Sequence, residues 1–284
     1  MSLIESKAVR ESINKVVFYG MGIVLSLLWL VPFVISIFTA TKSLNELMAD
    51  PYMWLPPQVF TWDNFLRVWT EGNMSMYFRN SVIITVPAIV GTLFLSSLSA
   101  FALAFYRFRL NMTVLMIFVA GMLIPFQMLL IPVYQFSNTV GIYDTFQGVI
   151  LFHIAFQLGF CTFFLRNFMK TIPASLVQSA RIDGANDFVI YRKIIMPLTV
   201  SSLAALSVLE FTWIWNDYLW GLVLIQSDNL KPVTLGLVML QGQWVSSYNL
   251  IAAGAIIAAA APIAIFLFFQ RYFIQGLTVG AIKG

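Results

Sequence analysis

Residues 80–106, NSVIITVPAIVGTLFLSSLSAFALAFY, form a run of 27 residues without a charged side chain. A membrane-spanning helix needs about 20 predominantly apolar residues, so this run can cross a bilayer. The whole chain has the same character, because 60% of its 284 residues are hydrophobic and only 10% are charged. An ordinary soluble domain carries about 25% charged residues. The sequence therefore predicts an all-α membrane protein that crosses the bilayer several times.

Five other apolar stretches bring the predicted number of transmembrane helices to six, within a single transmembrane domain over residues 1–284. The charge-free runs 110–143 and 232–270 contain 34 and 39 residues, which is long for one crossing and short for two. Polar clusters near Gln135 and Gln241 are expected to separate the helix from a loop in each run. The predicted spans are 16–40, 80–105, 112–134, 146–168, 198–225 and 250–270.

The basic residues are distributed unequally between the two sides of the membrane. Six spans place both termini on one side, and twelve of the 16 Lys and Arg residues fall on that side. The positive-inside rule therefore predicts that both termini are cytoplasmic, so the net charge of +4 reflects topology and not a nucleic-acid partner. The twelve are Lys7, Arg10, Lys15, Arg107, Arg109, Arg166, Lys170, Arg181, Arg192, Lys193, Arg271 and Lys283, and the other four are Lys42, Arg67, Arg79 and Lys231.

Several classes of catalytic site are excluded by the residues that the chain lacks. A single histidine, His153, excludes the His-Glu-x-x-His zinc motif and leaves little scope for a Ser-His dyad. The sequence contains no Gly-x-Ser-x-Gly and no Gly-Lys dipeptide, so a phosphate-binding loop is also excluded. The single cysteine, Cys161, can form no intrachain disulfide. We expect no enzyme activity, metal site or cofactor in this chain, and we interpret His153 as a helix-packing residue and not a proton relay.

The main polar stretch on the cytoplasmic side is the connection 170–197, which contains IPASLVQSARIDGANDFVIYRKIIMP at positions 172–197. Pro173 is suited to the first turn of a short helix, and Gly184 permits a sharp turn. Pro197 is suited to the first turn of the membrane helix that follows. The connection therefore predicts a helix, a turn and a second helix on the membrane face, where a soluble partner can bind.

This connection resembles the cytoplasmic loop of the binding-protein-dependent ABC importer permeases, specifically their carbohydrate-type, maltose-permease-like branch. That loop has the form Glu-Ala-Ala, three residues, Gly, about nine residues and Ile-x-Leu-Pro. The present chain matches it with Gln178-Ser179-Ala180, Gly184, Ile194, Met196 and Pro197, and with Ala-Arg-Ile-Asp-Gly-Ala at positions 180–185. Gln178 and Ser179 replace Glu and Ala, so no ion pair through that Glu is expected.

The resemblance implies the type I ABC importer permease fold and one half of a heterodimeric pore in a bacterial or archaeal cytoplasmic membrane. It implies a second permease subunit, two ATP-binding subunits that bind ATP and Mg²⁺, and an extracytoplasmic solute-binding protein that delivers a sugar. The loop would form coupling helices that enter a groove on the ATP-binding subunits. The residues that would couple this chain to them are Gln178, Ser179, Ala180, Arg181, Asp183, Gly184, Ala185 and Pro197.

Polar residues inside the fifth predicted span are candidates for the translocation path, because ionisable groups in a span usually face a cavity or a partner. Glu210 and Asp217 are seven residues apart and would share one helix face. Trp213 and Trp220 repeat this spacing, and Asn216 lies beside them. Aromatic surfaces next to hydrogen-bonding groups suit a sugar. The alternative is that these residues pack against the partner permease.

Two further functions stay open at this point: an ABC permease for another solute, such as a polyol or glycerol phosphate, and a non-transport membrane scaffold. The outer connection 42–78 also has two interpretations. Its tryptophans, Trp54, Trp62 and Trp69, either form an interfacial aromatic belt or bind a partner protein.

Overall fold

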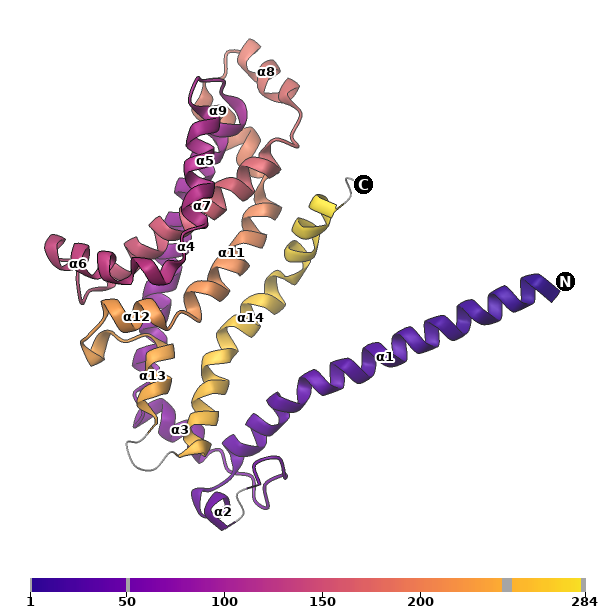
Figure 1. Ribbon diagram of the computed structural model, residues 1–284, viewed down its shortest axis with the longest axis vertical. Coiled ribbons are helices and arrows are strands. Elements are labelled where there is room, and N and C mark those ends of the chain that lie inside the picture. The colour runs from indigo at the N-terminus through magenta and orange to yellow at the C-terminus, as the bar shows by residue number, and fades with distance from the viewer. Residues whose placement is uncertain (1, 50–51, 242–246, 282–284) are drawn as a thin grey trace. The chain divides into compact units, whose positions relative to one another are not determined.

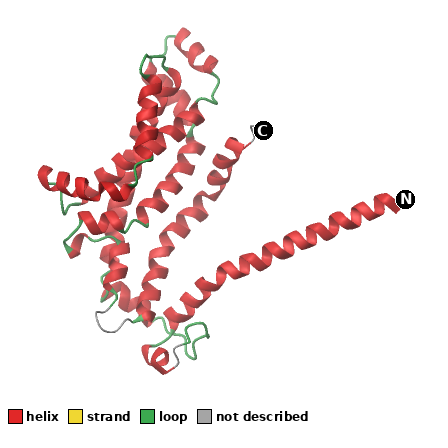
Figure 2. Ribbon diagram, in the orientation of Figure 1, coloured by secondary structure: helices red, strands yellow, loops and turns green. Residues whose placement is uncertain are grey.

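The computed structural model describes residues 2–49, 52–241 and 247–281, and the regular elements in this part of the chain are all helices (Figures 1 and 2). Helices are expected in lipid because they satisfy their own backbone hydrogen bonds. Lys283, one of the basic residues assigned to the cytoplasm, lies outside the described residues. The chain divides into two compact units, residues 1–72 with 240–257 and residues 73–239 with 258–284.

The first unit is organised around the buried side chain of Asn64. Its amide nitrogen donates to the carbonyl oxygens of Ala40 and Lys42, both at 2.8 Å. The amide of Asn249 in turn donates to the Asn64 side-chain oxygen at 2.9 Å. These bonds join α3 to the end of α1 and to the start of α14. The elements are α1 (Ser2–Thr41), α2 (Leu44–Ala49), α3 (Asp63–Thr70) and the first part of α14 (Tyr248–Ala281).

Three tryptophans of the outer connection have exposed side chains. Trp54 and Trp62 are 61% and 71% exposed, and Trp69 is 41% exposed. The other face of α3 is buried, since Asn64 and Val68 are 3% and 1% exposed. Both interpretations of this connection therefore stay predictions.

In the second unit, α4 packs along α7 and α11, and α5 packs against α7 (Figure 1). The first part of this unit comprises α4 (Met74–Phe105), α5 (Asn111–Met122), the 3₁₀ turn η1 (Phe126–Leu129), α6 (Leu130–Val140) and α7 (Phe146–Met169). It continues with α8 (Ala174–Ile182), α9 (Asp187–Ile190), the π-helical segment η2 (Tyr191–Ile195), α10 (Met196–Leu198) and α11 (Val200–Trp215). Beyond α11 lie α12 (Leu219–Leu224), the 3₁₀ turn η3 (Asp228–Leu230), α13 (Val233–Met239) and the rest of α14.

Four described helices are long and apolar enough to cross a membrane, and the predicted spans 16–40, 80–105, 146–168 and 250–270 lie within them. Two bent helix pairs satisfy the same criteria if each pair is one span. The pairs are Asn111–Met122 with Phe126–Val140, bent by 92°, and Asp187–Leu198 with Val200–Trp215, bent by 72°. The four continuous stretches are Ile13–Thr41, Met74–Phe105, Phe146–Met169 and Tyr248–Arg271.

The bend at Pro125 differs from the straight helix expected over 112–134. The helix expected over 198–225 ends at Trp215 and is followed by the separate helix α12. Each of the two bends has a local cause. Pro125 has no N–H and adopts ψ 120°, so the helix cannot continue through it. At the second bend, Pro197 also lacks an N–H. The hydroxyl of Thr199 donates to the carbonyl oxygens of Ile195 and Met196 at 3.1 and 3.0 Å, which competes with the helical ladder.

Asp144 fixes the position of α12 beside the start of α7. Its carboxylate accepts hydrogen bonds from the backbone N–H groups of Gln226 and Ser227, both at 2.9 Å, and from the Ser227 hydroxyl. Burial by itself would raise the pKa of Asp144, but these hydrogen bonds hold this pKa below its usual range. The Asp144 N–H donates to the carbonyl oxygen of Leu224 at 3.0 Å, so four bonds join the two segments.

The close approach of α5 to α7 depends on Gly159, and we expect Gly159→Ala to destabilise the protein. A Cβ atom at this position would lie 2.9 Å from the carbonyl oxygen of Phe118. Such overpacking costs about 1–3 kcal/mol. Gly121→Ala in α5 is the matched control, because a Cβ there meets nothing within 4 Å and alanine favours a helix. The midpoint of thermal denaturation of the purified protein measures both effects. Equal midpoints for the two variants would contradict the close contact.

Candidate functional site

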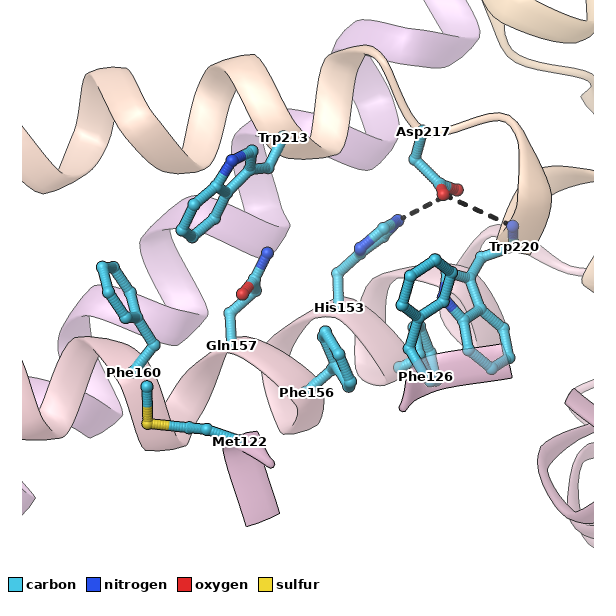
Figure 3. A pocket seen from close by; sticks show the side chains of 10 residues that line it. Met122, Phe126, His153, Phe156, Gln157, Phe160, Trp213, Asp217 and Trp220 are labelled. Carbon is cyan, nitrogen blue, oxygen red and sulfur yellow. Dashed lines mark hydrogen bonds and ion pairs between the residues drawn. The ribbon is translucent and has the colours of Figure 1, made fainter. Parts of the chain in front are cut away.

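A cavity of about 390 Å³ opens between α5, α7 and the turn from α11 to α12 (Figure 3). Most of its wall is aromatic. Phe160 and Trp213 meet edge to face with their ring centroids 5.1 Å apart, and Phe152 lies 3.7 Å from Trp220 by the same measure. The lining residues are Met122, Phe126, Phe152, His153, Phe156, Gln157, Phe160, Trp213, Asp217 and Trp220.

Half of this lining comes from one face of α7. Phe152, Phe156 and Phe160 are spaced four residues apart and form an aromatic row on the helix. His153 and Gln157 have the same spacing and form a polar row beside it. The helical period of α7 therefore places apolar surface and hydrogen-bonding groups side by side in one cavity.

Asp217 lies where α11 has ended and α12 has not yet begun. Its carboxylate accepts hydrogen bonds from the backbone N–H groups of Trp220 at 3.4 Å and Gly221 at 3.1 Å, in the first turn of α12. Nε2 of His153 lies 3.7 Å from the same carboxylate (Figure 3). The hydroxyl of Thr234 donates to the Asp217 carbonyl oxygen at 2.6 Å. Asp217 thus satisfies the backbone at the break and presents its carboxylate to the cavity.

Gln157 is the polar group of the cavity that remains available to a ligand. The residue is only 8% exposed, and its amide makes no hydrogen bond to the described residues. Figure 3 shows this amide extending into the cavity toward Trp213. Because this amide lines the cavity, a polar molecule bound there would find both a donor and an acceptor in it. Gln157 was not predicted from the sequence, although a polar pair four residues apart in an apolar helix is a detectable signal.

Of the five residues predicted for the path, Trp213, Asp217 and Trp220 line the cavity, whereas Glu210 and Asn216 do not. Glu210 is fully buried and accepts a hydrogen bond from the Cys161 thiol at 3.1 Å. Asn216 is exposed and donates to the carbonyl oxygen of Thr212 on its own helix. The predicted shared face of Glu210 and Asp217 assumed a continuous helix, but α11 ends at Trp215. The role of Glu210 and Asn216 in the translocation path stays a prediction.

The predicted coupling helix is α8, and its two faces have different environments. Val177 and Ala180 are buried in a core that contains Phe101, Leu165 and Met169 of α4 and α7. The predicted coupling residues are otherwise mostly exposed: Gln178, Ser179, Arg181, Asp183, Gly184 and Pro197 are exposed, and Ala185 is half-buried. The structure therefore anchors α8 on the transmembrane helices and leaves its outer face free.

The turn after α8 requires Gly184, which has φ +82°. The N–H of Ala185 donates to the carbonyl oxygen of Ala180 at 2.9 Å, and the N–H of Gly184 donates to that of Arg181 at 3.1 Å. This pair of bonds is a Schellman motif, in which the left-handed position favours glycine. The prediction of a sharp turn at Gly184 is thus explained by its backbone conformation.

Three side chains fasten α8 and α9 to the end of α4. Arg181 forms an ion pair with Asp187 at 3.1 Å, and its guanidinium lies 5.4 Å from the ring centroid of Tyr106. A hydrogen bond from Tyr106 and the charge of Arg181 hold the pKa of Asp187 below its usual range. Deeper in the unit, the hydroxyl groups of Ser97 and Tyr191 are hydrogen-bonded at 2.7 Å. These contacts join α8, α9 and η2, which together form the predicted coupling segment, to α4 at two levels.

Among the residues whose side chains are described, no group of three His, Cys, Asp or Glu residues could hold a metal ion. The wall of the cavity offers aromatic surfaces and hydrogen-bonding side chains.

Three sequence relatives are named as transport system permease proteins. The alpha-glucoside transport system permease protein AglG of Rhizobium meliloti is 36% identical over 81% of this chain, which spans 62% of the length of AglG. The arabinooligosaccharides transport system permease protein AraQ of Halalkalibacterium halodurans is 35% identical over 80% of this chain and 81% of its own. AraQ of Bacillus subtilis is 32% identical over 92% of both chains.

A solved structure shares the fold. A chain in the crystal structure of a bacterial ABC transporter involved in the import of the acidic polysaccharide alginate matches with a TM-score of 0.81 and 22% identity, over 92% of this chain and 97% of that one. The predicted all-α fold of an importer permease is thereby confirmed. Residues 92–279 match the family model described as binding-protein-dependent transport system inner membrane component. The chain therefore belongs to the family of binding-protein-dependent transport system inner membrane components, as its resemblance to the ABC importer permeases indicated.

Proposed function

We propose that this chain is the permease subunit of a sugar importer and forms half of a heterodimeric pore with a second, different permease. It is a transport permease and not an enzyme. Two ATP-binding subunits, which carry ATP and Mg²⁺, drive the cycle, and a solute-binding protein outside the cytoplasmic membrane delivers the sugar. Relatives named for alpha-glucosides and arabinooligosaccharides support this proposal.

The observation that carries the proposal is the aromatic cavity with its polar row. A sugar ring has apolar C–H faces, which pack on aromatic rings, and hydroxyl edges, which need hydrogen-bond partners. Trp213 and Phe160 supply the apolar surface, and Gln157 supplies an unpaired donor and acceptor beside them. The path therefore passes between α5, α7 and the α11–α12 turn of this subunit.

The charge of the cavity distinguishes between the possible solutes. Among the described residues that line it, Asp217 and His153 are the ionisable ones, and none is Lys or Arg. A carboxylate repels an anion in a site with few compensating charges. This composition favours an uncharged sugar or polyol over glycerol phosphate.

The outer surface of the coupling segment supports binding to a soluble subunit. Ile182 and Phe188 are 86% and 64% exposed on either side of the Gly184 turn. Exposed apolar side chains rimmed by polar ones indicate a protein-binding surface. Since the opposite face of α8 shares a buried core with the transmembrane helices, a shift of α8 would move these helices as well. A non-transport scaffold has no need of such a connection.

We expect Gln157→Ala to lower sugar uptake by about two- to tenfold, because one or two hydrogen bonds to the sugar are lost. Uptake is measured in proteoliposomes that contain the assembled transporter and saturating binding protein. ATP hydrolysis stimulated by the binding protein reports assembly and should persist. Gln135→Ala is the matched control, because Gln135 is an exposed glutamine of α6 outside the cavity. Wild-type uptake by the Gln157 variant would place the sugar elsewhere.

Gly184→Ala should impair coupling through the backbone alone. A Cβ atom at Gly184 meets nothing within 4 Å, but φ +82° costs a non-glycine residue about 1–2 kcal/mol. Asparagine tolerates this conformation better, so Gly184→Asn should retain more ATP-driven transport than Gly184→Ala. Transport and ATP hydrolysis are measured together on each assembled complex. Equal, normal coupling in both variants would exclude a role for the turn.

The proposed orientation predicts opposite labelling of two exposed serines. In a Cys161→Ser background, Ser175→Cys in α8 should react only with a thiol reagent that reaches the cytoplasm. Ser43→Cys lies just beyond the C-terminal end of α1 and should react with an impermeant reagent in intact cells. Both predictions follow from the positive-inside rule. Labelling of both sites from one side would disprove the orientation.

A further inference from the structure

A second cavity, of about 700 Å³, lies where α4 ends, α5 begins and α7 ends. Its lining includes two arginines of the α4–α5 turn, Arg107 and Arg109, and two basic residues at the end of α7, Arg166 and Lys170. None of the described residues that line it is acidic. Four like charges around one cavity repel each other, so the site favours an anion.

Arg166 shows that this preference is built into the fold. It is only 9% exposed, and its Nε atom is buried without a hydrogen-bond partner among the described residues. Its guanidinium has one long contact, 3.5 Å from the side-chain oxygen of Asn167, and no described carboxylate lies within 4.0 Å of it. A buried cation without a counter-charge is strongly destabilising. An anion that enters the cavity would supply both the charge and the acceptor.

The apolar part of the same lining identifies the kind of anion. Leu103, Phe108 and Met112 line the cavity together with the basic residues. From Met112, which is 57% exposed, the surface of α5 continues with Met116 and Ile117, which are 53% and 65% exposed. A phosphate beside a continuous apolar strip along a membrane helix matches the headgroup and acyl chain of a phospholipid.

We propose that this cavity binds an anionic phospholipid, with its phosphate among Arg107, Arg109, Arg166 and Lys170 and an acyl chain along α5. The basic residues lie at the ends of membrane-spanning helices, where lipid headgroups lie. In the orientation proposed above, the lipid belongs to the cytoplasmic leaflet. The lipid would hold the α4–α5 turn against the end of α7, next to the coupling segment.

The test compares the lipids that the assembled transporter retains. Complexes are reconstituted in nanodiscs of phosphatidylcholine and phosphatidylglycerol, extracted in mild detergent and examined by native mass spectrometry. Arg109→Gln with Lys170→Gln changes two exposed side chains, so the fold is preserved. Each lost charge should lower retention of phosphatidylglycerol relative to phosphatidylcholine by about fivefold. Arg166→Gln should lower it further, and Lys15→Gln, an exposed basic residue of α1, is the control.

Three results would overturn the proposal. The first is an unchanged ratio of the two lipids in both cavity variants. The second is loss of the ATP-binding subunits from the variant complexes with lipid retention unchanged, which would assign the anion to a carboxylate of a partner protein. The third concerns the wild-type complex in phosphatidylcholine alone. If inorganic phosphate raises its thermal stability as much as phosphatidylglycerol does, the site would be assigned to free phosphate.

Discussion

The constraint on which this structure depends is that a bilayer offers no hydrogen-bond partners to the backbone. A continuous helix without an internal proline, such as α7, satisfies this constraint by itself. Breaks in other helices must be satisfied by the protein, and at the end of α11 this is done by Asp217 and Thr234. The aromatic cavity lined by Trp213 and Trp220 lies beside this break and beside the one at Pro125. Irregular backbone at membrane depth is tolerated where it borders a cavity, so the breaks and the candidate path occur together.

At the other end of the second unit, beside the coupling segment, the protein again supplies hydrogen bonds at a bend between helices. At the bend between α10 and α11, the Thr199 hydroxyl donates hydrogen bonds to the carbonyl oxygens of Ile195 and Met196. The segment that precedes it packs into one core with α4, α7 and α11. Close-packed protein interiors transmit displacement and do not absorb it. The outer surface of α8 and the spans are thus mechanically connected through apolar side chains.

Hydropathy predicts part of this structure well, because charge-free length decides whether a segment spans the membrane. The spans at 80–105 and 146–168 lie within α4 and α7 for this reason. Hydropathy does not predict the direction of a helix, because an apolar run has the same hydropathy whether it is straight or bent at Pro125. The assumption of a straight fifth helix placed Glu210 beside Asp217, whereas the helix ends between them. Gln157 was missed because an average over an apolar window conceals one amide.

The basic residues show what the positive-inside rule explains and what it does not explain. The positive-inside rule is satisfied equally well by an exposed arginine such as Arg109 and by the buried Arg166. The rule therefore gives no reason for burial, which costs a guanidinium its hydration. The flexible stem of an arginine could carry its charge into water, as long basic side chains at helix ends commonly do. Arg166 instead faces three other cations in a cavity without a carboxylate among its described lining residues, and the exposed apolar face of α5 beside it favours the anionic phospholipid proposed above as the counter-charge.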